Sequence, residues 1–325
     1  MKKNITVLTL CAMLSAPCSF AEAQQPGKIF RIGFLDQSTA SGMAVLVDAF
    51  RQELRKLGWI EGKNITIEYR FGEQKSERMP ELAADLVRLK VDLIVVSGGG
   101  TPLAAKKATN TIPIVMTSSV DPVGEGLVAS LARPGGNITG NSGLSRELIT
   151  KRLEIIKDAI PGLSRVGLLR SGPVDIQTKD LSAAAVALKL KLEEIETQPD
   201  PKSLESAFQA AKQKQVGAIM TTAGRRFFAE RKRIVELAVK YRLPAIYPQD
   251  EFVDAGGLMS YGTDLTDLFQ RAAVYVDKIL KGAKPADLPV QQATKFEFVI
   301  NLKAAKQIDL TVPPEVLARA NKVIK

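Results

Sequence analysis

The segment with the clearest potential for chemistry is a glycine-rich turn, Ser97-Gly98-Gly99-Gly100-Thr101, which follows an apolar run at residues 91–96. Such a turn between a buried strand and a helix presents backbone N–H groups to an anion. A P-loop is disfavoured because the next lysine here is Lys106, too far from the last glycine. A dinucleotide-binding turn has the pattern Gly-x-Gly-x-x-Gly and follows the first strand. Here the glycines follow the third predicted strand and the last glycine of that pattern is absent, so dinucleotide binding is also disfavoured. The turn is therefore expected to bind a carboxylate. The alternative is that it is a tight turn in which small residues are needed only for packing.

The absence of histidine and the position of both cysteines exclude several chemistries. Cys11 and Cys18 lie in an N-terminal segment with the pattern of a removable leader. A Cys/His zinc site, a cysteine nucleophile and a Ser-His-Asp triad are therefore excluded from the mature chain. We expect no metal ion and no cofactor, whereas carboxylate-only or Ser–Lys catalysis stays open.

Residues 1–23 have the pattern of a secretory signal peptide. Lys2 and Lys3 give a basic start, an apolar stretch follows at residues 5–14, and Ala21-Glu22-Ala23 matches the small-x-small cleavage rule. Cleavage after Ala23 would place the mature protein in the periplasm, and the alternative is an uncleaved membrane anchor. Beyond this segment the sequence has no apolar run long enough for a transmembrane helix.

The net charge of +10 permits two classes of partner. A basic protein attracts nucleic acid or acidic surfaces and substrates. Export argues against nucleic acid, so no DNA or RNA partner is expected. The basic run at residues 225–234 has helical spacing and is expected to form a solvated helix face.

Strand and helix patterns alternate along the chain, and these elements must position the turn. Apolar strand-like segments lie at residues 28–35, 64–70, 91–96, 112–118, 164–170, 191–196, 216–222 and 243–248. Residues with helical periodicity separate them, and we also expect a short helix at 125–131 and a helical tail at 313–324. A glycine-rich break at residues 132–143 divides the chain into two similar halves. The pattern predicts an α/β protein with two Rossmann-like lobes, each built on a parallel sheet, and a cleft between them.

The candidate ligand-binding residues are those that follow predicted strands, because ligands of parallel sheets bind beyond the carboxyl ends of the strands. In the first half they are Asp36, Ser38, Ser97, Gly99, Gly100, Thr101, Thr117, Ser118, Ser119 and Asp121. In the second half they are Arg170, Ser171, Thr222, Arg225 and Asp250, and Tyr261 lies on a predicted connection beside the cleft. Trp59 is expected at the opposite end of the first sheet, away from the ligand.

Three motifs, GWIEGKNITIEYR, DPVGEGLVASLARPGGNITG and GLMSYG, point to a known family. With them, essentially the whole mature chain resembles the ABC-transporter substrate-binding proteins whose better-known members bind tryptophan or tyrosine. The resemblance implies the type I periplasmic-binding-protein fold, with two lobes joined by three crossings that close on a small ligand. It also implies an ABC permease of the inner membrane as partner. In such proteins the turns at Gly99–Thr101 and Thr117–Asp121 contribute to ligand binding.

The second half departs from the pattern that the resemblance implies. Arg170-Ser171 stands where relatives commonly carry asparagine and a small residue, and Asp250-Glu251 stands where Arg-Glu is frequent. A guanidinium fork at Arg170 or Arg225 would suit a carboxylate, so we expect a dicarboxylic or aromatic acid. Two alternatives stay open: both arginines pair with protein carboxylates, or Asp250 holds the amine of an amino acid.

The predicted protein is an exported solute-binding protein of an ABC importer that captures a small carboxylate-bearing ligand by hinge closure. The expected lobes are residues 28–137 plus 264–288 and residues 143–260 plus 294–325. Hinges are expected near residues 136–143, 260–263 and 289–294. The alternatives are an exported sensor or scaffold with the same fold and, more remotely, a carboxylate-based hydrolase.

Overall fold

The computed structural model describes residues 28–171 and 176–325, without the side chains of residues 145, 146, 176 and 177. The predicted signal peptide, residues 1–23, lies outside the described residues. Within those two ranges, the helices are all too short or too polar to cross a membrane.

The first sheet has six strands and is parallel throughout. Its order is β11-β5-β4-β3-β1-β2. The strands are β1 (Phe30–Asp36), β2 (Ile65–Phe71), β3 (Leu93–Ser97), β4 (Ile114–Ser119), β5 (Ile138–Ser142) and β11 (Gln291–Gln292). All five residues of β3 are buried, as expected for a central strand covered on both faces.

The second sheet has seven strands in the order β13-β12-β10-β9-β8-β6-β7. Its strands are β6 (Arg165–Arg170), β7 (Lys191–Glu196), β8 (Ala218–Thr221), β9 (Ala245–Tyr247), β10 (Met259–Thr263), β12 (Phe296–Asn301) and β13 (Lys322–Ile324). Only the pairing of β10 with β12 is antiparallel among these described strands. The predicted α/β architecture with two mostly parallel sheets is confirmed.

Helices cover both faces of each sheet. Successive side chains of a strand point to opposite faces, and the two faces of a sheet pack into different hydrophobic cores. On the first sheet α1 (Ala40–Lys56) and α10 (Leu265–Leu280) cover one face, and α2 (Met79–Arg88) and α3 (Thr101–Ala108) cover the other. On the second sheet α4 (Ser145–Ala159) and α5 (Ile176–Ala187) lie opposite α6 (Pro201–Gln213) and α8 (Arg231–Lys240). The short helices are α7 (Arg225–Ala229), α9 (Glu251–Asp254), α11 (Leu302–Gln307) and α12 (Pro314–Leu317).

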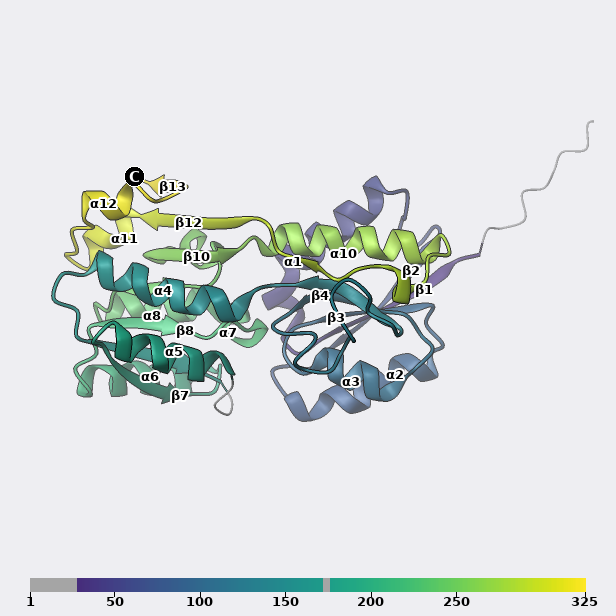
Figure 1. The fold of residues 1–325 in the computed structure, drawn as a ribbon, viewed down its shortest axis with the longest axis horizontal. Coiled ribbons are helices and arrows are strands. Elements are labelled where there is room, and N and C mark those ends of the chain that lie inside the picture. Colours follow the sequence, from purple (N-terminus) through teal and green to yellow (C-terminus); the bar gives the residue numbers. More distant parts are fainter. Residues whose placement is uncertain (1–27, 172–175) are drawn as a thin grey trace, which may run out of the picture.

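The chain passes between the sheets at three places within the described residues (Figure 1). It leaves the first sheet after β5, returns after β10, and leaves again between β11 and β12. The strands β5, β10 and β11 therefore lie in the three segments that the sequence suggested as hinges. The two sheets lie side by side along the long axis of the molecule.

Two local predictions were wrong. The segment 125–131 contains turns instead of a helix, because Gly126 adopts φ +65° and the Pro122 carbonyl accepts hydrogen bonds from the backbone N–H groups of Leu127 and Val128. The tail is helical only at α12, and β13 then pairs with β12, placing Val323 opposite Ile300. Pairing with β12 thus overrides the helical propensity of the last residues.

Candidate ligand-binding cavity

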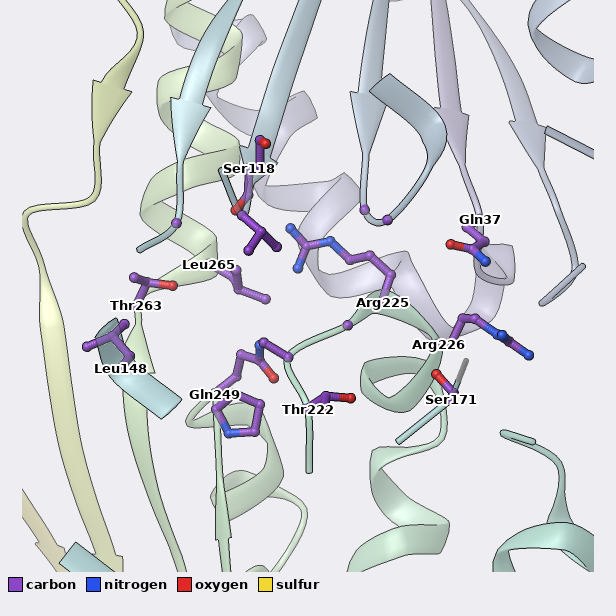
Figure 2. A pocket seen from close by; sticks show the side chains of 18 of the residues that line it. Gln37, Ser118, Leu148, Ser171, Thr222, Arg225, Arg226, Gln249, Thr263 and Leu265 are labelled. Atoms are coloured by element: carbon purple, nitrogen blue, oxygen red, sulfur yellow. The ribbon is translucent and has the colours of Figure 1, made fainter. Parts of the chain in front are cut away.

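A cavity of about 320 Å³ lies between the carboxyl ends of strands from the two sheets (Figure 2). From the first half, residues that directly follow β1, β3 and β4 line it, including Gln37, Gly98 and Val120. From the second half, residues that directly follow β6, β8 and β9 line it, including Thr222 and Gln249. The cavity therefore occupies the position at which parallel sheets bind ligands.

Six of the sequence-predicted residues line this cavity: Gly99, Ser118, Ser119, Ser171, Thr222 and Arg225. Five others lie fully buried behind the wall: Asp36, Ser38, Ser97, Thr101 and Thr117. The remaining five, Gly100, Asp121, Arg170, Asp250 and Tyr261, are not among the lining residues. The strand-end rule thus located the cavity, but it did not separate the residues that line the cavity from those buried behind them.

The glycine-rich turn packs against an arginine. Gly98 has φ +81°, and a Cβ atom at this position would lie 2.3 Å from Cγ of Arg225. The Thr101 hydroxyl donates to the Gly98 carbonyl at 2.6 Å, so it closes the turn. Only Gly99 and Gly98 of this turn line the cavity. The turn needs glycine at position 98 because a side chain there would collide with Arg225 and would strain the backbone.

Arg225 begins α7 in the second half of the chain and contacts the first sheet. Its side chain is 7% exposed, and its guanidinium lies 5.3 Å from the ring centroid of Phe269 on α10. Figure 2 shows this side chain pointing toward the side on which Ser118 lies. Burial lowers the pKa of Arg225, while the charges of Asp36 and Glu251 oppose that shift. Arg225 therefore combines a position on the cavity wall with contacts to both halves.

Asp36 supports Arg225 from the end of β1. One carboxylate oxygen accepts a hydrogen bond from the Ser38 backbone N–H at 2.7 Å. Burial raises the pKa of Asp36 to about 6, and the Ser38 hydrogen bond and the Arg225 charge act in the opposite direction. The second oxygen, Oδ2, has no hydrogen-bond partner among the described residues. Asp36 is thus a buried counter-charge for Arg225 and does not line the cavity.

The acidic pair at the start of α9 also lies behind the wall. Burial and the charge of Asp250 raise the pKa of Glu251 to about 8. Burial likewise raises the pKa of Asp250. Neither carboxylate is among the lining residues, whereas the neighbouring Gln249 is.

Arg170 does not reach the cavity, because carboxylates of the adjacent strand hold it. Its Nε donates to Glu194 at 3.1 Å, and its Nη2 lies 3.1 Å from a carboxylate oxygen of Glu196. Arg170 and Glu196 are direct partners in the β6–β7 register. For this residue, pairing with protein carboxylates, one of the two alternatives left open by the sequence, is what the structure shows.

Sequence reasoning missed Arg152, a cavity-lining residue on α4. Its side chain is 1% exposed, and Nη1 donates to the Tyr261 carbonyl at 3.1 Å. Nε and Nη2 have no hydrogen-bond partner among the described residues. Burial lowers the pKa of Arg152 to about 9, so the guanidinium stays charged at neutral pH. Its spacing from Ile149 and Ile156 places it within the apolar stripe of the helix, and this was the available signal.

Glu125 and Thr263 also line the cavity. The Ser119 hydroxyl donates to the Glu125 carboxylate at 3.3 Å, and burial raises the pKa of Glu125. Tyr261 itself packs edge-on against Phe298 in the second core. In the part of the chain that the structure describes, no three His, Cys, Asp or Glu side chains gather in a group that could hold a metal ion.

Two mostly parallel β-sheets, each covered by helices and separated by such a cavity, define the type I periplasmic-binding-protein fold. Solved structures of this fold resemble the chain closely. A conserved domain protein from Vibrio cholerae is 28% identical, with a TM-score of 0.82, covering 91% of this chain and 100% of that one. An ABC domain from Streptococcus pneumoniae in complex with L-Trp is 26% identical, with a TM-score of 0.79, covering 91% and 99%.

The chain belongs to the family of ABC transporter substrate binding proteins, whose family model matches residues 37–324. A curated relative, a tyrosine-binding protein from Clostridioides difficile, is 27% identical over 262 residues, which are 80% of this chain and 75% of the relative. The family resemblance predicted from the sequence is confirmed. Members of this family are substrate-binding proteins and not enzymes.

Proposed function

We propose that this protein captures a small carboxylate-bearing ligand, an amino acid or an organic acid, in the cavity between its two sheets. It delivers this ligand to an ABC permease of the inner membrane. The protein acts in the periplasm after removal of residues 1–23. Family membership supports the role in transport, and a tyrosine-binding relative and a relative in complex with L-Trp support a carboxylate ligand.

The observation that carries this proposal is a cavity between the two halves whose second-half wall contains two buried guanidinium groups. Its volume of about 320 Å³ lies within the range of small-molecule sites, about 300–1,000 Å³. Arg152 and Arg225 both line it and are almost fully buried. Guanidinium groups in such surroundings favour planar anions. Gly99, Ser118, Ser119, Ser171 and Thr222 supply the remaining polar contacts from the predicted set.

Ligand capture proceeds by movement of the two lobes about the connecting segments. These segments are residues 136–143, 260–263 and 289–294, and the lobes are residues 28–137 plus 264–288 and residues 143–260 plus 294–325. A ligand that contacts both walls favours the arrangement in which they are close. The contact between Arg225 and the first sheet supports this mechanism.

Native mass spectrometry of the purified protein, followed by a thermal-shift screen of organic acids and amino acids, tests the proposal. A ligand that binds only the folded protein raises the melting temperature. We expect acids to raise it and matched neutral or cationic compounds to leave it unchanged. A consistent preference for neutral or cationic compounds would contradict the carboxylate class. Binding without uptake, in cells that lack only the permease, separates capture from transport.

A further inference from the structure

Arg152 is a buried cation without a counter-charge. The described residues form no ion pair with it, and its one hydrogen bond goes to a backbone carbonyl, that of Tyr261. A buried charge without a partner strongly destabilises a protein. A protein can retain such a charge where a bound ligand supplies the missing counter-charge. Arg152 lines the cavity, where a ligand could do so. The missing partner is therefore expected in the cavity.

The unpartnered atoms of Arg152 define the shape of that partner. Nη1 is occupied by Tyr261, and Nε and Nη2 are free among the described residues. Nε–H and the adjacent Nη2–H point the same way along one edge of the planar guanidinium group, and this edge matches the two oxygens of a carboxylate. The hydrogen bond from Nη1 to the Tyr261 carbonyl of β10 fixes the orientation of the guanidinium plane. Arg152 is thus preorganised for one planar anion.

The other two arginines of the cavity wall each donate to a protein side chain. Arg225 donates to Ser97 and lies near Asp36, and Arg226 donates to the Gln198 side chain at 2.6 Å. We propose that Arg152 binds the carboxylate of the transported ligand through its Nε and Nη2 edge. It thereby selects acids over their amides. This inference rests on the proposed function and names the residue that sets the ligand class.

Calorimetric titration of the mature protein tests the assignment with matched pairs. The probes are L-tyrosine, L-tryptophan, 3-(4-hydroxyphenyl)propanoate and glutarate, each beside its primary amide. For the wild type we expect at least one acid to bind about 10- to 100-fold more tightly than its amide, as charge-assisted hydrogen bonds imply. The tyrosine and hydroxyphenylpropanoate arms show whether an amino acid or an organic acid supplies the carboxylate.

Two substitutions separate recognition by Arg152 from general charge. Arg152→Gln should remove the preference for the acid, and Arg152→Lys should lose about tenfold in affinity because it keeps the charge but lacks the planar fork. Arg165→Gln is the matched control, since Arg165 lies at the opposite end of β6 and bonds the Lys214 carbonyl. It should bind every acid as the wild type does.

The melting temperature of the unliganded protein provides the second readout. Arg152→Gln should keep or raise it, because the substitution removes an uncompensated buried charge, while the acid-induced increase disappears. If Arg152→Gln fails to fold, Arg152→Lys carries the test. Wild-type discrimination between acid and amide in either variant would overturn the assignment but leave acid capture intact. Failure of every acid to bind the wild type would instead contradict the proposed function itself.

Discussion

Arg225, from the second half of the chain, donates from Nε to the Ser97 hydroxyl of the first sheet at 3.0 Å. The two residues are 128 positions apart in the sequence and both are buried. The hydrogen bond connects the start of α7 with the end of β3, so it spans the boundary that lobe movement would open.

Ser97→Ala should lower the free energy of unfolding by about 1–3 kcal/mol. The substitution leaves the buried Nε–H of Arg225 without its acceptor, and an unsatisfied buried donor costs about this much. Urea unfolding followed by circular dichroism measures the change. Ser206→Ala is the control, because that hydroxyl is exposed on α6 and bonds only its own helix backbone. Equal stability of the two variants would contradict a structural role for the Arg225–Ser97 contact.

Gly98→Ala and Gly100→Ala should differ although they lie two residues apart. A Cβ at Gly98 meets Arg225 at 2.3 Å on a backbone with φ +81°, whereas a Cβ at Gly100 meets nothing within 4 Å and the backbone has φ −79°. The left-handed backbone alone costs a non-glycine residue about 1–2 kcal/mol. Gly98→Ala should therefore destabilise the protein and displace Arg225, while Gly100→Ala stays close to the wild type in thermal unfolding. Similar melting temperatures for both variants would show that Arg225 is not seated on the turn.

The buried carboxyl group of Asp36 should make stability depend on pH. Burial raises its pKa from 3.8 to about 6 in the folded protein, so its protonated form favours the fold. That stabilisation is fully present below the unfolded value and is lost as the pH rises through about 6. From about pH 4 to about pH 7, Asp36→Asn should gain up to about 3 kcal/mol relative to the wild type. Urea unfolding at stepped pH measures this difference.

Asp200→Asn provides a control of opposite sign. Hydrogen bonds from Ser203 lower the pKa of Asp200, the cap of α6. Its stabilisation is present above the unfolded pKa and is lost as the pH falls. This variant should therefore lose stability relative to the wild type as the pH rises. A pH-independent difference for Asp36→Asn would show that Asp36 does not bind its proton more tightly in the folded state.

The intrinsic fluorescence of Trp59 should not respond to ligand. Its Nε1 donates to Asp277 at 2.9 Å, and its ring packs edge-on against Phe30, where β1 begins. The cavity lies beyond the other end of β1. Titration with any acid that raises the melting temperature should leave the emission unchanged, whereas Thr222→Trp places an indole on the cavity wall and should report the same titration. A ligand-dependent change at Trp59 would mean that binding alters the far end of the first sheet.

The sequence located the cavity because that inference depends only on the backbone. Alternation of strands and helices predicts parallel sheets, and parallel sheets bring the residues after β1, β3 and β4 to one edge. Ser119 and Thr222 were found in this way. No knowledge of side-chain partners was needed for that step.

The choice of arginine could not be predicted in the same way. Arg170 follows the strand-end rule, but its position opposite Glu196 in the β6–β7 register decides its partner. Arg152 lies on a helix, and its direction toward the cavity follows from how α4 packs after the chain leaves β5. Register and helix placement are tertiary properties, so a rule based on strand ends includes Arg170, which does not line the cavity, and omits Arg152, which does.

The position of Arg225 has a consequence for changing the specificity of this protein. One side chain forms part of the cavity wall and also joins the two sheets. Under the proposed capture mechanism, substitutions selected for a new ligand at this position are therefore expected to alter the rate of release as well as the affinity. Directed evolution of a biosensor on this scaffold would best vary Thr222 and Gln249, which line the cavity from the second half, and leave Arg225 unchanged.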